Sequence, residues 1–222
     1  RNNVGLQVDV PLEEQHVNFL RAFEELDREE AQRKKRDGFS YFVPNQRQLE
    51  SFRSNCPTVI IVAGNRVGKT TSGCIELISH CLGKYRGCVC HGEWMGLKRR
   101  LHPPIKAVIV TTEYPIIERA IEPTLMMYLP MNEVESIKRT PQGYLRRLHF
   151  KNGSSVDVLT NEMDQLAFES ANWDFAWIDE PTQKAKYEAI TRGLLDRGGL
   201  ARITFTPIVE PWMKEELVDK ED

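Results

Sequence analysis

The 222-residue sequence has no apolar run long enough to span a membrane, and no signal-peptide pattern opens it. It also has no excess of one charge sign: 30 Lys and Arg residues balance 32 Asp and Glu residues, for a net charge of −2. A strongly basic nucleic-acid footprint is therefore absent, and any contact with DNA would need a local patch such as residues 33–36 or 98–100. We expect no association with a membrane.

Cysteine is scarce and odd in number, with five residues in the chain. This number, without an export signal, favours reduced thiols over a disulfide framework. His80, Cys81, Cys88, Cys90 and His91 crowd one stretch, but Cys-x-Cys-His is not a common zinc-ligand spacing. The pattern therefore favours free thiols, with a zinc site as the alternative.

A glycine-rich loop follows the apolar run 58–62 and precedes a segment with helical character. Residues 63–70 have the spacing of a phosphate-binding loop, except that Ala63 stands where the first glycine usually lies. At this spacing Lys69 places a charge on the β- and γ-phosphates, and the Thr70 hydroxyl can bind Mg²⁺. A strand, such a loop and a helix together predict a nucleoside triphosphate site.

A second motif lies about 110 residues further along, where the apolar run 175–178 ends in Asp179 and Glu180. Acids at the carboxyl end of a parallel strand lie where α/β sheets hold their ligands. We expect Asp179 to hold Mg²⁺, directly or through water, and Glu180 to orient and deprotonate the attacking water. The added glutamate favours hydrolysis over a switch or a simple kinase.

Three further features agree with ATP as the nucleotide. Gln46 or Gln48 lies about twenty residues before Lys69, and an amide can both donate to and accept from adenine. Arg66 lies inside the loop, where a guanidinium could reach the γ-phosphate of the same subunit, or instead brace the loop. Thr204 and Thr206 end a strand about 25 residues after Asp179, and hydroxyls there can sense the γ-phosphate.

Hydrophobic patterning predicts alternating helices and strands. Helices are expected at 11–36, 44–52, 69–82, 114–128 and 182–195, and strands at 58–62, 105–111, 144–150, 155–159, 175–178 and 200–206. Asn152-Gly153 predicts a hairpin between two of these strands, and residues 83–104 are expected to form a long loop. The alternation predicts an α/β domain whose mostly parallel central sheet is flanked by helices.

Four motifs in this order resemble those of the ATPase domain of large terminases, the DNA-packaging motor subunits of tailed bacteriophages. They are Pro-Asn-x-x-Gln at 44–48, Gly-Asn-Arg-Val-Gly-Lys-Thr at 64–70, Trp-Ile-Asp-Glu-Pro at 177–181 and Thr-Phe-Thr-Pro at 204–207. The resemblance covers roughly residues 40–210 and implies the additional-strand (ASCE) type of P-loop NTPase fold.

The resemblance also implies roles for residues. Gln48 would read adenine, with Gln46 as its competitor, and Glu180, Lys69 and Arg66 would act in catalysis. The nucleotide-binding set would be completed by loop residues and by the acidic and threonine motifs, namely Gly64, Asn65, Val67, Gly68, Thr70, Thr71, Asp179, Thr204 and Thr206. Thr70 and Asp179 would be the Mg²⁺ ligands. A neighbouring subunit would insert an arginine, for which Arg119 is the candidate and Arg192 and Arg197 compete.

By the same resemblance, the expected partners are double-stranded DNA, a homo-oligomeric ring (a pentamer in this family), a portal protein and a small terminase subunit. The expected location is the host cytoplasm, and transiently the procapsid portal. A helicase-type DNA-dependent ATPase is the alternative, although such enzymes normally carry a second recombinase-like domain.

We expect three regions along the chain: a helical extension at 1–40, the ATPase domain at 41–212 and the start of a linker at 213–222. Large terminases usually continue into a nuclease domain with a cluster of metal-binding acids. The residues after 207 are too few to build one, so nuclease activity is not expected of this sequence.

Overall fold

We analysed a computed structural model that describes residues 12–84, 101–169, 171–206 and 211–219. The chain divides into two compact units, with the boundary between Arg36 and Asp37. No helix within the described ranges is both long enough and apolar enough to cross a membrane.

The first unit contains one long helix, α1 (Leu12–Arg36). Ion pairs one turn apart support it, including Glu29 with Arg33 at 3.2 Å and Glu30 with Lys34 at 2.9 Å. Its apolar side chains remain exposed in this unit, and Phe23 is 56% exposed. The helix confirms the prediction for 11–36 within one residue.

The second unit is built on a seven-stranded sheet in the order β1-β7-β6-β2-β5-β4-β3. The strands are β1 (Thr58–Val62), β2 (Lys106–Thr111), β3 (Val134–Arg139), β4 (Leu145–Phe150), β5 (Ser155–Thr160), β6 (Phe175–Asp179) and β7 (Leu200–Phe205). The first five positions in that order pair in parallel, while β4 and β3 pair antiparallel at one side. The predicted α/β class with a mostly parallel sheet is confirmed.

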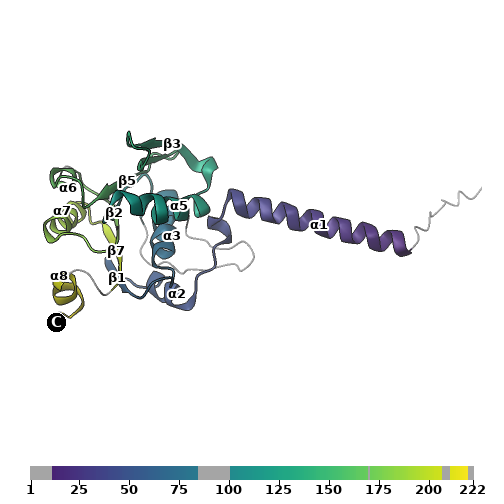
Figure 1. The fold of residues 1–222 in the computed structure, drawn as a ribbon, viewed down its shortest axis with the longest axis horizontal. Helices are drawn as coiled ribbons and strands as arrows, with labels where there is room; N and C mark the ends of the chain where they lie inside the picture. Colours follow the sequence, from purple (N-terminus) through teal and green to yellow (C-terminus); the bar gives the residue numbers. More distant parts are fainter. Residues whose placement is uncertain (1–11, 85–100, 170, 207–210, 220–222) are drawn as a thin grey trace, which may run out of the picture. The chain divides into compact units, whose positions relative to one another are not determined.

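Helices cover both faces of this sheet (Figure 1). One face carries α3 (Lys69–Leu82) and α5 (Glu122–Tyr128), and the other carries α6 (Leu166–Glu169) and α7 (Lys184–Leu195). The shorter elements are α2 (Gln46–Phe52), α4 (Tyr114–Ile116), α8 (Pro211–Met213), the 3₁₀ turns η1 (Phe39–Tyr41) and η3 (Met131–Glu133), and the π turns η2 (Ile117–Ile121) and η4 (Lys214–Val218).

The central strands are apolar without interruption because both of their faces are buried. In β2, Ala107 and Ile109 join the core under α3, whereas Val108 and Val110 join the core under α7. In β6, Trp177 lies in the first core and Ile178 in the second. Such runs are typical of parallel strands covered on both faces.

Two elements differ from the sequence-based expectation. The helix expected over 114–128 contains the π turn η2, which ends just before Pro123. Proline has no backbone N–H and its ring crowds the preceding turn, so a wider turn accommodates it. Strand β3 was not predicted, because its sequence Val-Glu-Ser-Ile-Lys-Arg mixes charged and apolar residues and it forms one border of the described sheet.

A buried ion pair joins helix α3 to strand β7. The guanidinium of Arg202 donates to the carboxylate of Glu76, and both side chains are fully buried. Arg202 also donates to the hydroxyl of Ser51 at 3.2 Å and lies over the ring of Phe52, 5.0 Å from its centroid. These contacts tie α2, α3 and β7 together beneath the carboxyl edge of the sheet.

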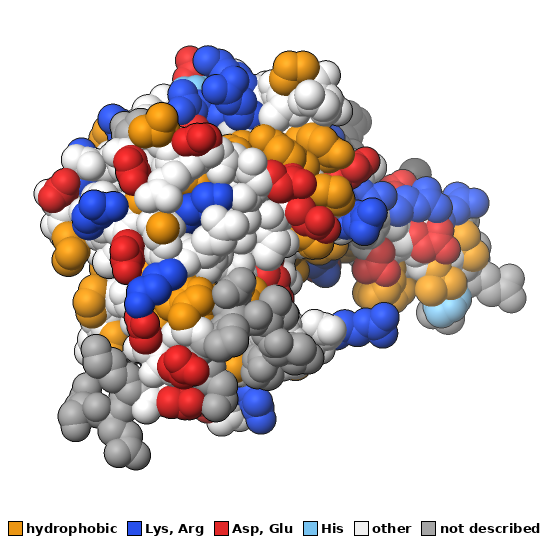
Figure 2. Space-filling view, turned by 60° about the vertical axis from the view of Figure 1, so that its left-hand side comes forward, with side chains coloured by type: hydrophobic (Ala, Val, Ile, Leu, Met, Phe, Trp, Pro, Cys, Tyr) orange, Lys and Arg blue, Asp and Glu red, His pale blue; other side chains and the backbone are white. Residues whose placement is uncertain are grey.

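On the face that Figure 2 presents, basic and acidic side chains are interspersed. This agrees with the near-neutral net charge of −2. The surface on this face therefore does not form a strip of one sign.

Gly73 in α3 lies against Trp177, and we predict that Gly73→Ala destabilises the fold. A Cβ at this position would lie 2.2 Å from Cε2 and Nε1 of the indole. Alanine favours helix by about 1 kcal/mol, but overpacking of a core typically costs about 1–3 kcal/mol, and a contact this close belongs at the upper end. We therefore expect a net loss of about 2 kcal/mol in the free energy of unfolding, measured by chemical denaturation.

The matched control is the same substitution in a Trp177→Phe background. Phenylalanine has a smaller side chain than tryptophan and lacks the indole nitrogen that lies 2.2 Å from the new methyl group, so Gly73→Ala should cost clearly less there. An equal loss in both backgrounds would show that the indole is not the source of the constraint.

Candidate nucleotide site

The loop at 63–68 links β1 to α3 and has the backbone geometry of a phosphate cradle. Gly68 precedes the helix with φ of 86°, in the left-handed region that favours glycine. A Cβ at Gly68 would also lie 2.6 Å from the amide nitrogen of Gln48. Ala63 has no positive φ, and its N–H donates to Phe205 O at 3.2 Å, so this position has no need of glycine.

Lys69 is buried at the start of α3, and its ammonium points back into the loop. It donates to the carbonyls of Ala63 at 2.8 Å and Gly64 at 2.9 Å. It also donates to the hydroxyl of Thr206 at 3.1 Å. All three N–H donors of the ammonium thus have acceptors at the point where phosphate oxygens would lie in a P-loop.

Thr70 and Asp179 meet across the two motifs. The Thr70 hydroxyl donates to Oδ2 of Asp179 at 3.2 Å, although 109 residues separate them. Oxygen atoms of hydroxyl and carboxylate groups are ligands that Mg²⁺ accepts. The residues present therefore fit a magnesium ion beside the start of α3.

Burial raises the pKa of Asp179 from 3.8 to about 6. The negative charge of Glu180 acts in the same direction, whereas hydrogen bonds from Thr204 and Thr70 and the charge of Lys69 oppose the rise. Asp179 is only 3% exposed, so removal of water is the dominant cause. A cation at this carboxylate would favour its ionised form.

Glu180 lies at the end of β6, and Thr206 holds its carboxylate. The Thr206 N–H donates to Oε2 of Glu180 at 3.1 Å, and the Thr206 hydroxyl lies 3.1 Å from Oε1. The same hydroxyl lies 3.3 Å from Oδ1 of Asn65 in the loop. Thr206 therefore contacts Lys69, Asn65 and Glu180, which connects the loop to the acidic motif.

Two non-glycine residues in the described ranges have a left-handed backbone, and both belong to this site. Arg66 has φ of 63° and Glu180 has φ of 70°. Each such conformation costs on the order of 1–3 kcal/mol and persists only where its surroundings hold it. For Glu180 the holding contact is its N–H, which donates to Thr204 O at 2.7 Å.

The two candidate glutamines lie in different surroundings. Gln46 is exposed at the start of α2, whereas Gln48 is buried. The Gln48 amide donates to Gly68 O at 2.9 Å and accepts from Asn45 N at 2.9 Å, as part of a capping box. Gln48 thus braces the loop from α2, and it lines a small hollow of about 40 Å³ beside Val67 and Gly68.

The remaining predicted residues occupy three kinds of position. Gly64, Asn65, Arg66 and Val67 are exposed on the loop, and Thr71 is half-buried in the first turn of α3. Thr204 is fully buried, and its hydroxyl contacts Asp179 rather than the loop.

The three candidate arginines differ in their partners. Arg192 lies 4.0 Å from Glu169, and Arg197 donates to Asp174 at 2.6 Å. Arg119 is exposed on the π turn η2, and no ion pair joins it to another described side chain. Of the three candidate arginines, Arg119 is thus the one that forms no ion pair with a described acidic side chain of its own chain.

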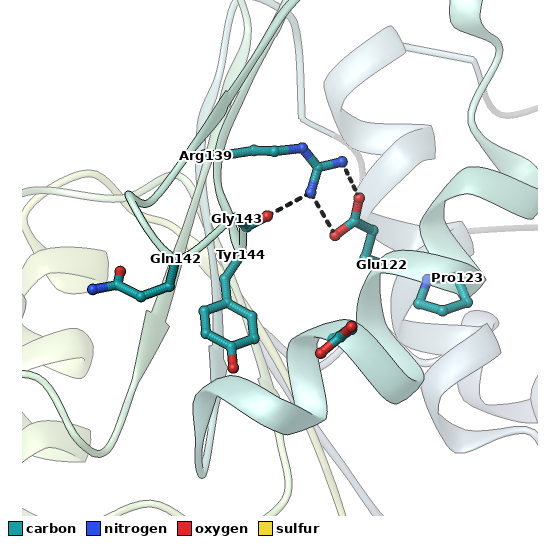
Figure 3. A pocket seen from close by; sticks show the side chains of 7 residues that line it. Glu122, Pro123, Arg139, Gln142, Gly143 and Tyr144 are labelled. Carbon is teal, nitrogen blue, oxygen red and sulfur yellow. Dashed lines mark hydrogen bonds and ion pairs between the residues drawn. The ribbon is translucent and has the colours of Figure 1, made fainter.

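A hollow of about 470 Å³ lies beside the helix that carries Arg119 (Figure 3). Arg139 spans it, donating to the carboxylate of Glu122 and, at 2.9 Å, to Gly143 O. This pair fastens the turn between β3 and β4 to the start of α5.

The sequence did not predict a set of hydrogen bonds between Asn161 and the two residues that follow Glu180. Asn161, just after β5, donates from its side chain to Pro181 O at 3.1 Å and accepts from the Thr182 hydroxyl at 2.5 Å. The segment that follows the acidic motif is thereby tied to β5. A polar residue directly after a buried strand was the only signal that the sequence offered.

The alternative zinc site falls mostly outside the described residues, which do not include Cys88, Cys90 and His91. His80 and Cys81 are both fully buried on α3, and burial raises the pKa of the Cys81 thiol. Within the described ranges, no three His, Cys, Asp or Glu side chains gather closely enough to hold a metal ion.

Comparison with protein families gave a match over residues 60–220 to the family described as "Terminase large subunit, T4likevirus-type, N-terminal". Comparison with curated proteins gave no match.

Solved structures share the fold at low sequence identity. The Thermus phage P74-26 large terminase ATPase domain has a TM-score of 0.54 and 20% identity, covering 78% of this chain and 69% of its own. The large terminase of a thermophilic bacteriophage has a TM-score of 0.55 and 15% identity, covering 82% of this chain and 43% of its own. A structure of that same bacteriophage terminase in complex with ATP-gamma-S has a TM-score of 0.53 and 15% identity, covering 78% and 40%.

We predict that Asp179→Asn stabilises the fold in the absence of Mg²⁺ at neutral pH. A carboxyl whose pKa rises on folding binds its proton more tightly in the folded state, so stability falls as pH rises from 3.8 to about 6 and stays lower above that. Two pKa units correspond to about 3 kcal/mol, and asparagine carries no such penalty. The free energy of unfolding should therefore exceed that of wild type by about 1–3 kcal/mol at pH 7.5, and the difference should vanish as the pH falls below 3.8.

Urea denaturation across this pH range measures the effect, with Asp196→Asn on the exposed end of α7 as the control. The control should follow wild type at every pH. A pH-independent difference for Asp179→Asn would mean that burial does not perturb this carboxyl.

Proposed function

The chain belongs to the T4-like large terminase family and is an ATPase of viral DNA packaging, and we propose that it drives double-stranded DNA into a procapsid by hydrolysing ATP at the Lys69–Asp179–Glu180 site. The chain spans 43% of the thermophilic bacteriophage's large terminase, so the activities of the rest of such a protein are not assigned to it. The observation that carries the proposal is the meeting of the loop lysine, the metal-binding pair and the glutamate at one edge of the sheet. The helicase-type alternative is not favoured.

Each residue has a separate task in the proposed reaction. Lys69, together with the N–H groups at the start of α3, binds the β- and γ-phosphates of ATP. Thr70 and Asp179 would hold Mg²⁺, which neutralises charge that develops on the phosphate oxygens. Their 3.2 Å approach supports this pairing.

Glu180 is the proposed general base. Its carboxylate accepts a hydrogen bond from the Thr206 N–H and lies next to the Thr206 hydroxyl. These contacts fix the position of the carboxylate beside the phosphate-binding loop. Deprotonation of a water by Glu180 would give the nucleophile that attacks the γ-phosphate. Because Thr206 also accepts from Lys69, it is suited to register whether a γ-phosphate has displaced that contact.

For adenine we propose Gln48 rather than Gln46. The Gln48 amide already braces Gly68, so it has one N–H and one lone pair left for a base. We infer that Gln48 couples base binding to the shape of the loop. Exposed Arg66 is proposed to contact the γ-phosphate within the same subunit.

We propose that the working form is a homo-oligomeric ring, a pentamer, docked on a portal protein and supplied with DNA by a small terminase subunit. In such a ring, exposed Arg119 would reach the nucleotide of a neighbouring subunit. Arg192 and Arg197 are less suited because each already contacts an acid of its own chain. The proposed location is the host cytoplasm, with transient residence at the procapsid.

The overall proposal is tested by phosphate release from ATP with and without double-stranded DNA. The protein that contains this chain should release phosphate from ATP, and added double-stranded DNA should change the rate. Absence of ATP hydrolysis under all assembly conditions would contradict the proposed activity.

Glu180→Gln should separate ATP binding from hydrolysis. Glutamine keeps the size and hydrogen bonding of the side chain but cannot accept the proton of water. Loss of a general base typically lowers the rate by about 10²–10⁴, so turnover should fall by at least 10² while ATP affinity stays near that of wild type. Stopped-flow phosphate release and equilibrium nucleotide binding measure the two quantities, and unchanged turnover would assign the base to another residue.

Mixing variants tests the arginine acting between subunits. If an arginine acts between subunits, the specific activity of wild type should rise with protein concentration, because an arginine finger contributes about 10³–10⁵ in rate. Arg119→Ala should abolish this rise. Glu180→Gln subunits keep Arg119, so mixing them with Arg119→Ala subunits should restore hydrolysis. Arg192→Ala is the matched control and should behave like wild type. A lack of rescue, where wild type is cooperative, would remove Arg119 from this role.

A further inference from the structure

The indole of Trp177 lies beneath the phosphate-binding helix and contacts the site from inside the protein. Trp177 is fully buried in β6, between the sheet and α3. Its ring fills the space that the missing side chain of Gly73 leaves, since a Cβ there would lie 2.2 Å from the indole nitrogen. The position of the indole N–H is therefore fixed by close packing.

This N–H donates to the hydroxyl oxygen of Thr204 at 3.1 Å. Thr204 lies on β7, beside Asp179 of β6 in the strand register, and its side chain is fully buried. The hydroxyl oxygen lies 2.7 Å from Oδ1 of Asp179 and 3.3 Å from Ile178 O. Trp177, Thr204 and Asp179 thus form a continuous hydrogen-bonded chain.

The chemistry of the three groups sets the direction of this chain. An indole N–H can only donate, so the Thr204 oxygen accepts from it. The hydroxyl has one proton, and the carboxylate oxygen at 2.7 Å is the nearer and charged acceptor. The proton of Thr204 therefore points at Oδ1 of Asp179.

The other carboxylate oxygen, Oδ2, faces the Thr70 hydroxyl at 3.2 Å. With Oδ1 tied to the interior by Thr204, the plane of the carboxylate is set and Oδ2 is directed toward the start of α3. That is the position where the proposed function requires a metal ligand. The site has no other described contact that fixes Oδ1.

We propose that Trp177 and Thr204 are positioning residues that orient the Asp179 carboxylate for the Mg²⁺ of the ATPase reaction. The proposal rests on the proposed role of Asp179 as a metal ligand and adds the residues that hold it. It also assigns different roles to the two threonines of the Thr-Phe-Thr motif. Thr204 acts on the metal ligand from within, whereas Thr206 contacts Lys69, Asn65 and Glu180.

The test measures metal binding directly, with Mn²⁺ as the probe and ADP bound, by electron paramagnetic resonance. Thr204→Val removes the hydroxyl at nearly constant volume, and Thr204→Ser retains it. Loss of an outer partner of a metal ligand typically lowers metal affinity by about 10–100-fold. We expect Thr204→Val to bind Mn²⁺ about 10-fold or more weakly, Thr204→Ser to stay within about threefold of wild type, and metal-free ADP binding to be unchanged in both.

Trp177→Phe provides an independent arm that leaves Thr204 in place. It removes the N–H donor, so Mn²⁺ affinity should fall in the same direction but by less than in Thr204→Val. If Thr204→Val does not fold, as judged by circular dichroism, the Mn²⁺ affinities of Trp177→Phe and Thr204→Ser test the proposal without it. Wild-type Mn²⁺ affinity in Trp177→Phe would then overturn the proposal.

Asp179→Asn separates this proposal from the proposed function. If Asp179→Asn loses Mn²⁺ affinity while Thr204→Val and Trp177→Phe bind like wild type, the positioning role is wrong and the ligand role stands. If Asp179→Asn itself binds Mn²⁺ like wild type, Asp179 is not the ligand and both proposals fail. Loss in Asp179→Asn and in Thr204→Val, with recovery in Thr204→Ser, supports both.

Discussion

The site depends on one constraint of topology: β7 lies between β1 and β6 in a parallel arrangement. Parallel strands deliver their carboxyl ends to the same edge of a sheet, so the residues after these three strands must meet there. Lys69 follows β1, Glu180 follows β6, and Thr206 follows the strand between them. Thr206 can therefore contact both at 3.1 Å, a geometry that adjacent β1 and β6 strands would not offer.

Buried contacts beneath this edge hold the inserted strand in place. Arg202 pairs with Glu76 inside the core, and burial of both charges would be costly without the pair and the added bond to Ser51. Trp177 packs against Gly73 from the neighbouring strand. The inserted strand also holds the left-handed backbone of Glu180, because the Glu180 N–H donates to Thr204 O at 2.7 Å.

The sequence predicted the parts whose signals are local. The bounds of β1 and α3 are as expected because an apolar β-branched run and a P-loop mark them directly. Strand β3 and the π turn η2 were not predicted, since β3 is specified by its pairing with β4, and a proline at position 123 does not by itself predict a π turn before it. The acids, the lysine and the threonines were identified by motif, but their partners were not. Thr204 contacts Asp179 in the interior, and Gln48 contacts Gly68. Both contacts join residues that are at least 20 positions apart, so local sequence patterns do not predict them.

The two threonines show why the contacts matter beyond the motif. Thr204 and Thr206 are two residues apart, which on a strand places both side chains on one face. Thr204, however, is still inside β7 and is covered by α3 and Trp177, whereas Thr206 lies past the strand's last residue and is half-buried. Asp179, the proposed metal ligand, is thus contacted from the buried interior by Thr204. Glu180, the proposed general base, is contacted by the half-buried Thr206. One strand therefore supplies a buried contact to the proposed metal ligand and, two residues later, a half-buried contact to the proposed general base, so the proposed positioning and sensing roles fall on separate threonines.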